Sequence, residues 1–248
     1  MLRLENVAVS FGKTDVLKNI NCTLEAGDFV VIVGGNGAGK STLFDTIAGK
    51  IKPQTGKISI NNQEVTNLDE IDRSSLVTRI FQKVDLNSIG SFSVAKNLAF
   101  ARYSRKAARL VDGMNTITQE EVAKIIANLG LDAAVIDRPM KSLSGGQKQL
   151  IAFAMATQQI PQILLLDEPT AALDPQASTT LLKHAVKFIK QHNVTTILIT
   201  HDPHIALHVG NKIWILEQGK IVKQFNQSEK NGLKPEDLIG QIDYKSLL

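Results

Sequence analysis

Short apolar runs that end in glycine or polar residues recur along this chain, and each predicts a buried β-strand. The clearest cover residues 29–33, 163–166 and 194–200, and a fourth strand is expected over residues 76–81. Strands that are apolar along their whole length are typical of a parallel sheet with helices on both faces. The pattern therefore predicts an α/β core.

Two other patterns flank and interrupt this core. Residues 2–9 and 16–24 alternate apolar and polar positions, which predicts two antiparallel strands with a turn at residues 11–13, and a closing hairpin is expected near residues 213–222. Between residues 93 and 140 the apolar period becomes helical, with a capping box at Thr118, and Ser144 is the apparent N-cap of a further helix that follows. We expect a helical subdomain inserted into the core.

Composition narrows the class of protein. The chain has 248 residues, of which 43% are hydrophobic and 21% charged, as in ordinary soluble globular proteins. No apolar stretch approaches the roughly 20 residues that cross a bilayer, and no signal peptide is visible, so a cytoplasmic location is expected. A net charge of +4 without a long basic run does not call for nucleic-acid binding.

A glycine-rich stretch directly follows the apolar run at residues 29–33. It matches the phosphate-binding pattern G-x-x-x-x-G-K-[ST] and consists of Gly34, Gly35, Asn36, Gly37, Ala38, Gly39, Lys40, Ser41 and Thr42. Such a loop turns backbone N–H groups and a helix N-terminus toward an anion. We expect a triphosphate here, with Lys40 at its β- and γ-phosphates and the Ser41 hydroxyl on a magnesium ion.

An acidic pair ends the apolar run at residues 163–166. Asp167 is placed to hold Mg²⁺ through its water shell, and Glu168 to polarise a water for attack on the γ-phosphate. By itself, an acidic pair at a strand end is equally well explained as a helix N-cap.

Four further positions are candidates for the same or a second site. Gln82 and His201 each follow a predicted strand, where α/β sheets place ligand contacts, although Gln82 also fits a plain surface residue. Ser144 opens a helix with two glycines, which indicates a second anion site. Phe11 fits either stacking on an adenine ring or packing in the core.

The order and spacing of these motifs resemble one family. Residues 34–42 look like a Walker A loop, Gln82 like the Q-loop, residues 143–149 like the ABC signature, residues 163–168 like Walker B, Asp174 like the D-loop and His201 like the H-switch. Over nearly its full length the chain resembles the ATP-binding subunit of an ATP-binding-cassette (ABC) transporter.

The resemblance implies a fold and a division of the chain. The fold is a P-loop NTPase (RecA-like) core with an N-terminal antiparallel β subdomain and an inserted α-helical subdomain, the ABC ATPase fold. Residues 1–82 and 160–228 would form the ATP-binding core with the antiparallel sheet, residues 83–159 the helical subdomain, and residues 229–248 a short tail.

The resemblance also implies a role for each site residue. Two subunits pair head to tail, and each ATP lies between one Walker A loop and the partner's signature, here Ser144, Gly145, Gly146 and Gln147. Glu168 would be the general base, and His201 and Lys40 would act on the γ-phosphate. Gln82 would join Ser41 and Asp167 around Mg²⁺. Asp174 would link the two sites, and Phe11 would stack on adenine.

The implied activity is ATP hydrolysis that powers transport through a separate permease, at the cytoplasmic face of the inner membrane. The partners would be a second copy or paralogue of the chain, the permease and an extracytoplasmic solute-binding protein. Residues 137–142 lack the acidic-glycine loop of many exporters, which favours an importer. Residues 155–157, 171–175 and 210–211 look similar to those of ATPases that serve amino acids, including aromatic ones, which suggests amino acids as solutes. An exporter ATPase and a soluble ABC ATPase of repair, assembly or translation are the alternatives.

Overall fold

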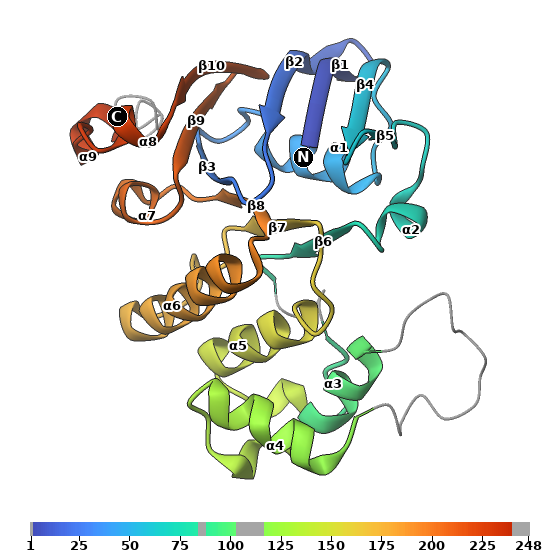
Figure 1. Ribbon diagram of the computed structural model, residues 1–248, viewed down its shortest axis with the longest axis vertical. Coiled ribbons are helices and arrows are strands. Elements are labelled where there is room, and N and C mark those ends of the chain that lie inside the picture. The colour runs from blue at the N-terminus through green and yellow to red at the C-terminus, as the bar shows by residue number, and fades with distance from the viewer. Residues whose placement is uncertain (1, 84–87, 103–116, 240–248) are drawn as a thin grey trace. The chain divides into compact units, whose positions relative to one another are not determined.

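The computed structural model describes residues 2–83, 88–102 and 117–239 (Figure 1). Residues 84–87 and 103–116 of the expected helical insert, and residues 240–248 of the expected tail, lie outside the described residues.

The chain forms two compact units, and each is discontinuous in sequence. The first comprises Met1–Arg79, Pro161–Glu168 and Phe188–Leu248, and the second comprises Ile80–Ile160 and Pro169–Lys187. Both sheets belong to the first unit, apart from the last residue of strand β6.

A six-stranded sheet with the order β10-β9-β3-β8-β7-β6 positions the candidate site. Its strands are β3 (Phe29–Val33), β6 (Val77–Ile80), β7 (Ile163–Asp167), β8 (Thr195–Ile199), β9 (Lys212–Glu217) and β10 (Lys220–Phe225). Strand β8 pairs in parallel with both β3 and β7, and all residues of β3 and β8 are buried. The prediction of a buried parallel sheet is confirmed, as is the closing hairpin, because β9 and β10 pair antiparallel.

The second sheet is antiparallel and has the order β2-β1-β4-β5. Its strands are β1 (Leu2–Phe11), β2 (Thr14–Leu24), β4 (Thr55–Ile60) and β5 (Gln63–Glu64). The first two strands are longer than the alternation predicts, because Phe11 pairs with Thr14 and only two residues remain in the turn. One of them, Gly12, has φ of 59°, a conformation that glycine adopts without strain.

In the first unit the helices are α1 (Lys40–Ala48), α2 (Glu70–Arg73), α7 (Pro203–His208), α8 (Gln227–Lys230) and α9 (Pro235–Ile239); in the second they are α3 (Val94–Arg102), α4 (Gln119–Asn128) and α5 (Gly145–Ala156), with 3₁₀ turns at Ala133–Val135 and Met140–Ser142. Helix α6 (Pro175–His192) has residues in both units. Helices α3 and α4 agree with the helical periodicity predicted between residues 93 and 140, whereas the sequence patterns do not predict α2 and α8.

The predicted helix starts are confirmed. Thr118 forms a complete capping box with Glu121, and the Ser144 side chain caps α5. Figure 1 shows α3, α4 and α5 lying together in the second unit. In the part of the chain that the structure describes, no helix has both the length and the apolar character that a membrane span requires.

The core of the first unit packs α1 against residues from both sheets, including Phe44 of α1, Leu4 of β1 and Trp214 of β9. The carboxyl end of α1 is closed by Arg73, a fully buried residue of α2. Its guanidinium donates hydrogen bonds to the carbonyl oxygens of Thr46, Ile47 and Thr66, at 2.7, 2.9 and 3.0 Å. Burial lowers the pKa of Arg73 from its ordinary value.

Replacing Arg73 by methionine tests this closure. The Arg73→Met change keeps an apolar stem but removes the guanidinium donor from three carbonyl oxygens, so we expect the free energy of unfolding to fall by about 2–4 kcal/mol. Urea denaturation measures the change. Ile71→Ala, on the same helix but at a side chain that is 64% exposed, is the control and should cost less than about 0.5 kcal/mol. Equal losses from the two variants would contradict the assigned role.

Candidate functional site

The phosphate-binding loop lies between β3 and α1, as its position after an apolar run predicts. Gly34 has no space for a side chain, because an added Cβ would lie 2.2 Å from the carbonyl oxygen of Leu216 in β9. Gly39 is the N-cap of α1, with φ of 101° and no capping side chain, while Asn36, Gly37 and Ser41 are exposed. The first-turn N–H groups of α1 are therefore left to an external acceptor, and an anion satisfies this requirement.

The ammonium group of Lys40 lies within the loop. Its Nζ donates hydrogen bonds to the carbonyl oxygens of Gly34 and Gly35, at 2.8 and 2.9 Å. Burial lowers the pKa of Lys40 from its ordinary value, while the carboxylates of Glu168 and Asp167 act in the opposite direction. The lysine is thus held in the field of the acidic pair that sequence predicts to act with it.

Glu168 and His201 meet at the carboxyl edge of the six-stranded sheet. Parallel pairing sets Asp167 of β7 opposite Ile199 of β8, so that both strands end at the same level. The Glu168 N–H donates to the Ile199 carbonyl oxygen at 3.1 Å, and its Oε2 lies 3.3 Å from Nδ1 of His201. No helix begins at Asp167 or Glu168, so the helix N-cap interpretation of this pair is wrong.

The backbone of Glu168 is in the left-handed region, with φ of 44°. Glutamate rarely adopts this conformation, which costs about 1–3 kcal/mol and persists only where the surrounding structure imposes it. The strand pairing and the hydrogen bond to Ile199 supply that constraint. The side chain of Glu168 is 23% exposed and that of His201 60% exposed, so both are open to solvent and to a ligand.

Asp167 is bonded to an arginine that the sequence patterns do not single out. Nη2 of Arg79, in β6, lies 2.5 Å from Oδ2 of Asp167. A signal for this contact exists: Arg79 is the charged residue inside the predicted strand at residues 76–81, and a charge buried in a sheet must find a partner.

The donor set near the loop suits magnesium. Ser41 and Asp167 offer oxygen atoms, which Mg²⁺ prefers, and it commonly takes one or two carboxylates and fills its remaining positions with phosphate oxygens and water. Among the described residues, no group of three or more histidine, cysteine, aspartate or glutamate side chains is arranged to hold a metal ion. The residues therefore fit a metal that arrives with phosphate groups rather than an all-protein metal centre.

The signature residues lie in the second unit and contact one another. Ser144 and Gln147 exchange hydrogen bonds in a capping box, with distances of 3.1 and 3.3 Å. Packing within the second unit also explains why residue 146 is a glycine, since an added Cβ would lie 2.8 Å from the Cβ of Ala177 in α6. The carboxylate of Asp174 accepts a hydrogen bond from the N–H of Ala177 at 2.9 Å.

The predicted site residues thus fall into two groups. The first unit brings the phosphate loop together with Asp167, Glu168 and His201. Gln82, which is exposed two residues after β6, lies in the second unit with the signature and Asp174. Phe11, in the first unit, is 54% exposed at the end of β1, so the interpretation of it as a core residue is wrong.

A family model described as "ABC transporter" matches residues 17–171, more than half of the chain. The chain belongs to the ABC transporter family. This ABC ATPase is 33% identical to a tyrosine transport ATP-binding protein of Clostridioides difficile, over 98% of its own length and 99% of the relative's. It is 32% identical to the arginine transport ATP-binding protein ArtM of Bacillus subtilis, over 92% of each chain.

Solved structures confirm the predicted ABC ATPase fold. A nucleotide-free ATP-binding cassette from an ABC transporter has a TM-score of 0.80 at 25% identity, covering 100% of this chain and 97% of that one. The dimeric post-hydrolysis structure of the ATP-binding cassette MJ0796, bound to ADP and Pi, has a TM-score of 0.76 at 27% identity, covering 92% and 99%. Family and fold together identify the chain as an ATPase.

The exposure of Phe11 makes its expected contact with adenine testable. Phe11→Ala should change the free energy of unfolding by less than about 0.5 kcal/mol, because the ring is largely solvated. Loss of a base-stacking ring should weaken ATP binding about tenfold and leave binding of inorganic triphosphate unchanged, as calorimetric titration can measure. Phe100→Ala is the control, since that ring is 62% exposed in α3. Identical ATP affinities for the two variants would contradict the stacking role.

Proposed function

We propose that this chain is the ATP-hydrolysing subunit that powers solute import through a separate membrane permease. The observation that carries the catalytic part is the approach of Glu168 to His201, at 3.3 Å, beside the loop that holds Lys40. The import direction is supported by the names of relatives, which include methionine and sulfate/thiosulfate import ATP-binding proteins.

Each group in the first unit has a chemical task in this proposal. The Glu168 carboxylate accepts a proton from the attacking water, and its constrained backbone fixes where that water is held. His201 contacts the same carboxylate through Nδ1 and stabilises the γ-phosphate through its other ring nitrogen, Nε2. Lys40 exchanges its bonds to loop carbonyls for bonds to the β- and γ-phosphates.

Ser41, Asp167 and Gln82 are proposed to hold the magnesium ion, Asp167 through a water molecule. When bound, the ion would neutralise part of the negative charge of the phosphate groups. Phe11 is proposed to bind the adenine ring by stacking.

Completion of the site is proposed to need a second copy or paralogue of the chain. Ser144, Gly145, Gly146 and Gln147 would then bind the γ-phosphate held by the partner subunit, and Asp174 would connect the two sites. This proposal is supported by the exposure of Ser144 and Gly145 and by the dimeric state of the similar cassette bound to ADP and Pi.

The proposed location is the cytoplasmic face of the inner membrane, where the dimer would associate with permease subunits and, through them, with an extracytoplasmic solute-binding protein. A similar chain is described as part of a transporter complex, which supports this association. Amino acids are the proposed solute class, because relatives that match over nearly their whole length are named for tyrosine and arginine transport.

The Glu168→Gln variant tests the assignment of the base. The amide keeps the size of the side chain but cannot accept the proton, so the ATP hydrolysis rate should fall by at least about 100-fold while ATP affinity stays within about threefold. A phosphate-release assay and a binding titration measure the two quantities. Glu120→Gln, on the exposed surface of α4, is the control. Undiminished hydrolysis in Glu168→Gln would exclude Glu168 as the base.

The solute class is tested with the complex rather than the subunit alone. We expect the chain, reconstituted in vesicles with its co-purified membrane and binding proteins, to hydrolyse ATP faster when tyrosine or arginine is added. Sulfate and spermidine are the comparison solutes. Stimulation by either of these, with no response to amino acids, would contradict the proposed class.

A further inference from the structure

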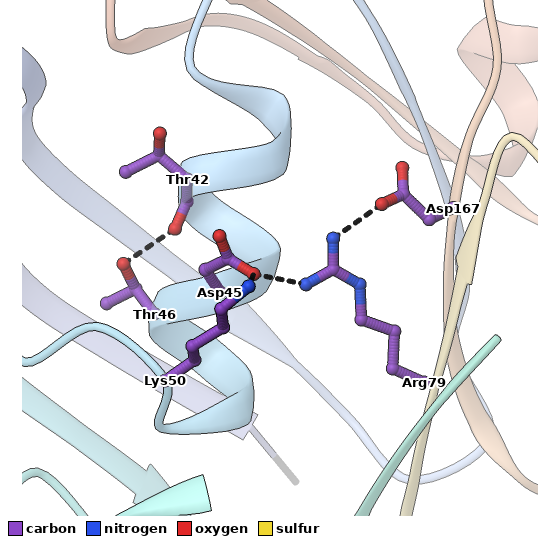
Figure 2. Close-up of polar contacts among 6 residues, drawn as sticks. All are labelled: Thr42, Asp45, Thr46, Lys50, Arg79 and Asp167. Atoms are coloured by element: carbon purple, nitrogen blue, oxygen red, sulfur yellow. Dashed lines mark hydrogen bonds and ion pairs between the residues drawn. The ribbon is translucent and has the colours of Figure 1, made fainter. Parts of the chain in front are cut away.

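Arg79 joins two carboxylates that come from distant parts of the chain. Nη1 contacts Oδ1 of Asp45 in α1, and Nη2 contacts Oδ2 of Asp167 at the end of β7, as Figure 2 shows. The side chains of Arg79, Asp45 and Asp167 are 9, 18 and 15% exposed, respectively. All three belong to the first unit.

The position of Asp45 on α1 connects this arginine bridge to the proposed magnesium ligand Ser41. Asp45 follows Ser41 by four residues, so the two side chains lie on one face of α1. The guanidinium also lies over the ring of buried Phe44, with its carbon 5.6 Å from the ring centroid. Arg79 therefore links the helix that carries Ser41 to the carboxylate expected to act with Ser41 on magnesium.

The charges around this bridge are unequal. One guanidinium contacts two carboxylates, and Lys50, whose side chain is 56% exposed, lies 3.7 Å from Asp45. An exposed ammonium at that distance contributes little. Without Arg79, Asp45 and Asp167 would lose a buried counter-charge, while Lys40 would still act on Asp167. A partly buried carboxylate pair that has lost such a partner attracts a cation more strongly.

We propose that Arg79 is a positioning residue that holds Asp167 as its ion-pair partner, and that it thereby sets the magnesium concentration at which nucleotide binds tightly. Arg79 and magnesium compete for the same carboxylate, so pairing with Arg79 lowers the affinity of Asp167 for the ion. Asp45 weakens the effect of Arg79 on Asp167, because it pairs with the same guanidinium. The inference rests on the proposed role of Asp167.

Two substitutions should move the magnesium requirement in opposite directions. Arg79→Met leaves Asp167 without its guanidinium, so about tenfold less Mg²⁺ should be needed for half-maximal binding. Asp45→Asn directs the full charge of Arg79 to Asp167, so several-fold more Mg²⁺ should be needed. Arg79→Lys keeps the positive charge, so its Mg²⁺ requirement should remain close to that of the unchanged chain.

The measurement is the Mg²⁺ midpoint for binding of a fluorescent ATP analogue to the full chain. A merely structural role would reduce the amplitude of binding in both variants without shifting the midpoints in opposite directions. Arg73→Met is the matched control: it removes another buried arginine that contacts α1, but one whose hydrogen bonds go to carbonyl oxygens rather than carboxylates. Its midpoint should not move.

The outcomes separate this inference from the proposed function. If Asp167→Asn leaves the midpoint unchanged, the metal role of Asp167 fails and the inference fails with it. If Asp167→Asn raises the midpoint but Arg79→Met does not lower it, only the role of Arg79 is overturned. Should Arg79→Met not fold, Asp45→Asn decides alone, and an unchanged or lower midpoint in that variant overturns the proposal.

Discussion

Parallel pairing of β8 with both β3 and β7 is the constraint on which the site depends. The backbone register sets Ile199 opposite Asp167 on one side and opposite Ile32 on the other, so three strands end at one edge of the sheet. The phosphate loop, the acidic pair and His201 each follow one of these ends. Because the register belongs to buried backbone, it brings these residues to the same edge, and side-chain contacts such as that of Arg79 with Asp167 then orient them.

Electrostatics then determines how the edge behaves. Lys40 stands in the field of Glu168 and Asp167, and Arg79 divides its charge between Asp167 and Asp45. Among the described residues, Lys40 and Arg79 thus lie near Asp45, Asp167 and Glu168, and Lys50 lies 3.7 Å from Asp45. A magnesium nucleotide adds both a cation and several anionic oxygens. In the proposed roles, Lys40 binds the added anionic oxygens, and Arg79 competes with the added cation for Asp167.

The sequence predicts most of the fold because its signals are local. Apolar runs predict the buried strands, the capping-box pattern and a serine at a helix start predict the caps at Thr118 and Ser144, and the glycine pattern predicts the phosphate loop. Two features could not be predicted in this way. The contact of Arg79 with Asp45 and Asp167 joins three elements across the fold, and the close approach of Ala177 to Gly146 depends on how α6 packs. Periodicity reports burial but does not identify the partner of a buried group.

The most direct test of the account is to isolate the tagged chain from detergent-solubilised membranes of its native host and to identify by mass spectrometry the proteins that accompany it. An ATPase subunit of an importer should bring down a polytopic membrane protein in stoichiometric amount. Recovery of soluble proteins alone, with the chain absent from the membrane fraction, would contradict the transport function and leave only the ATPase.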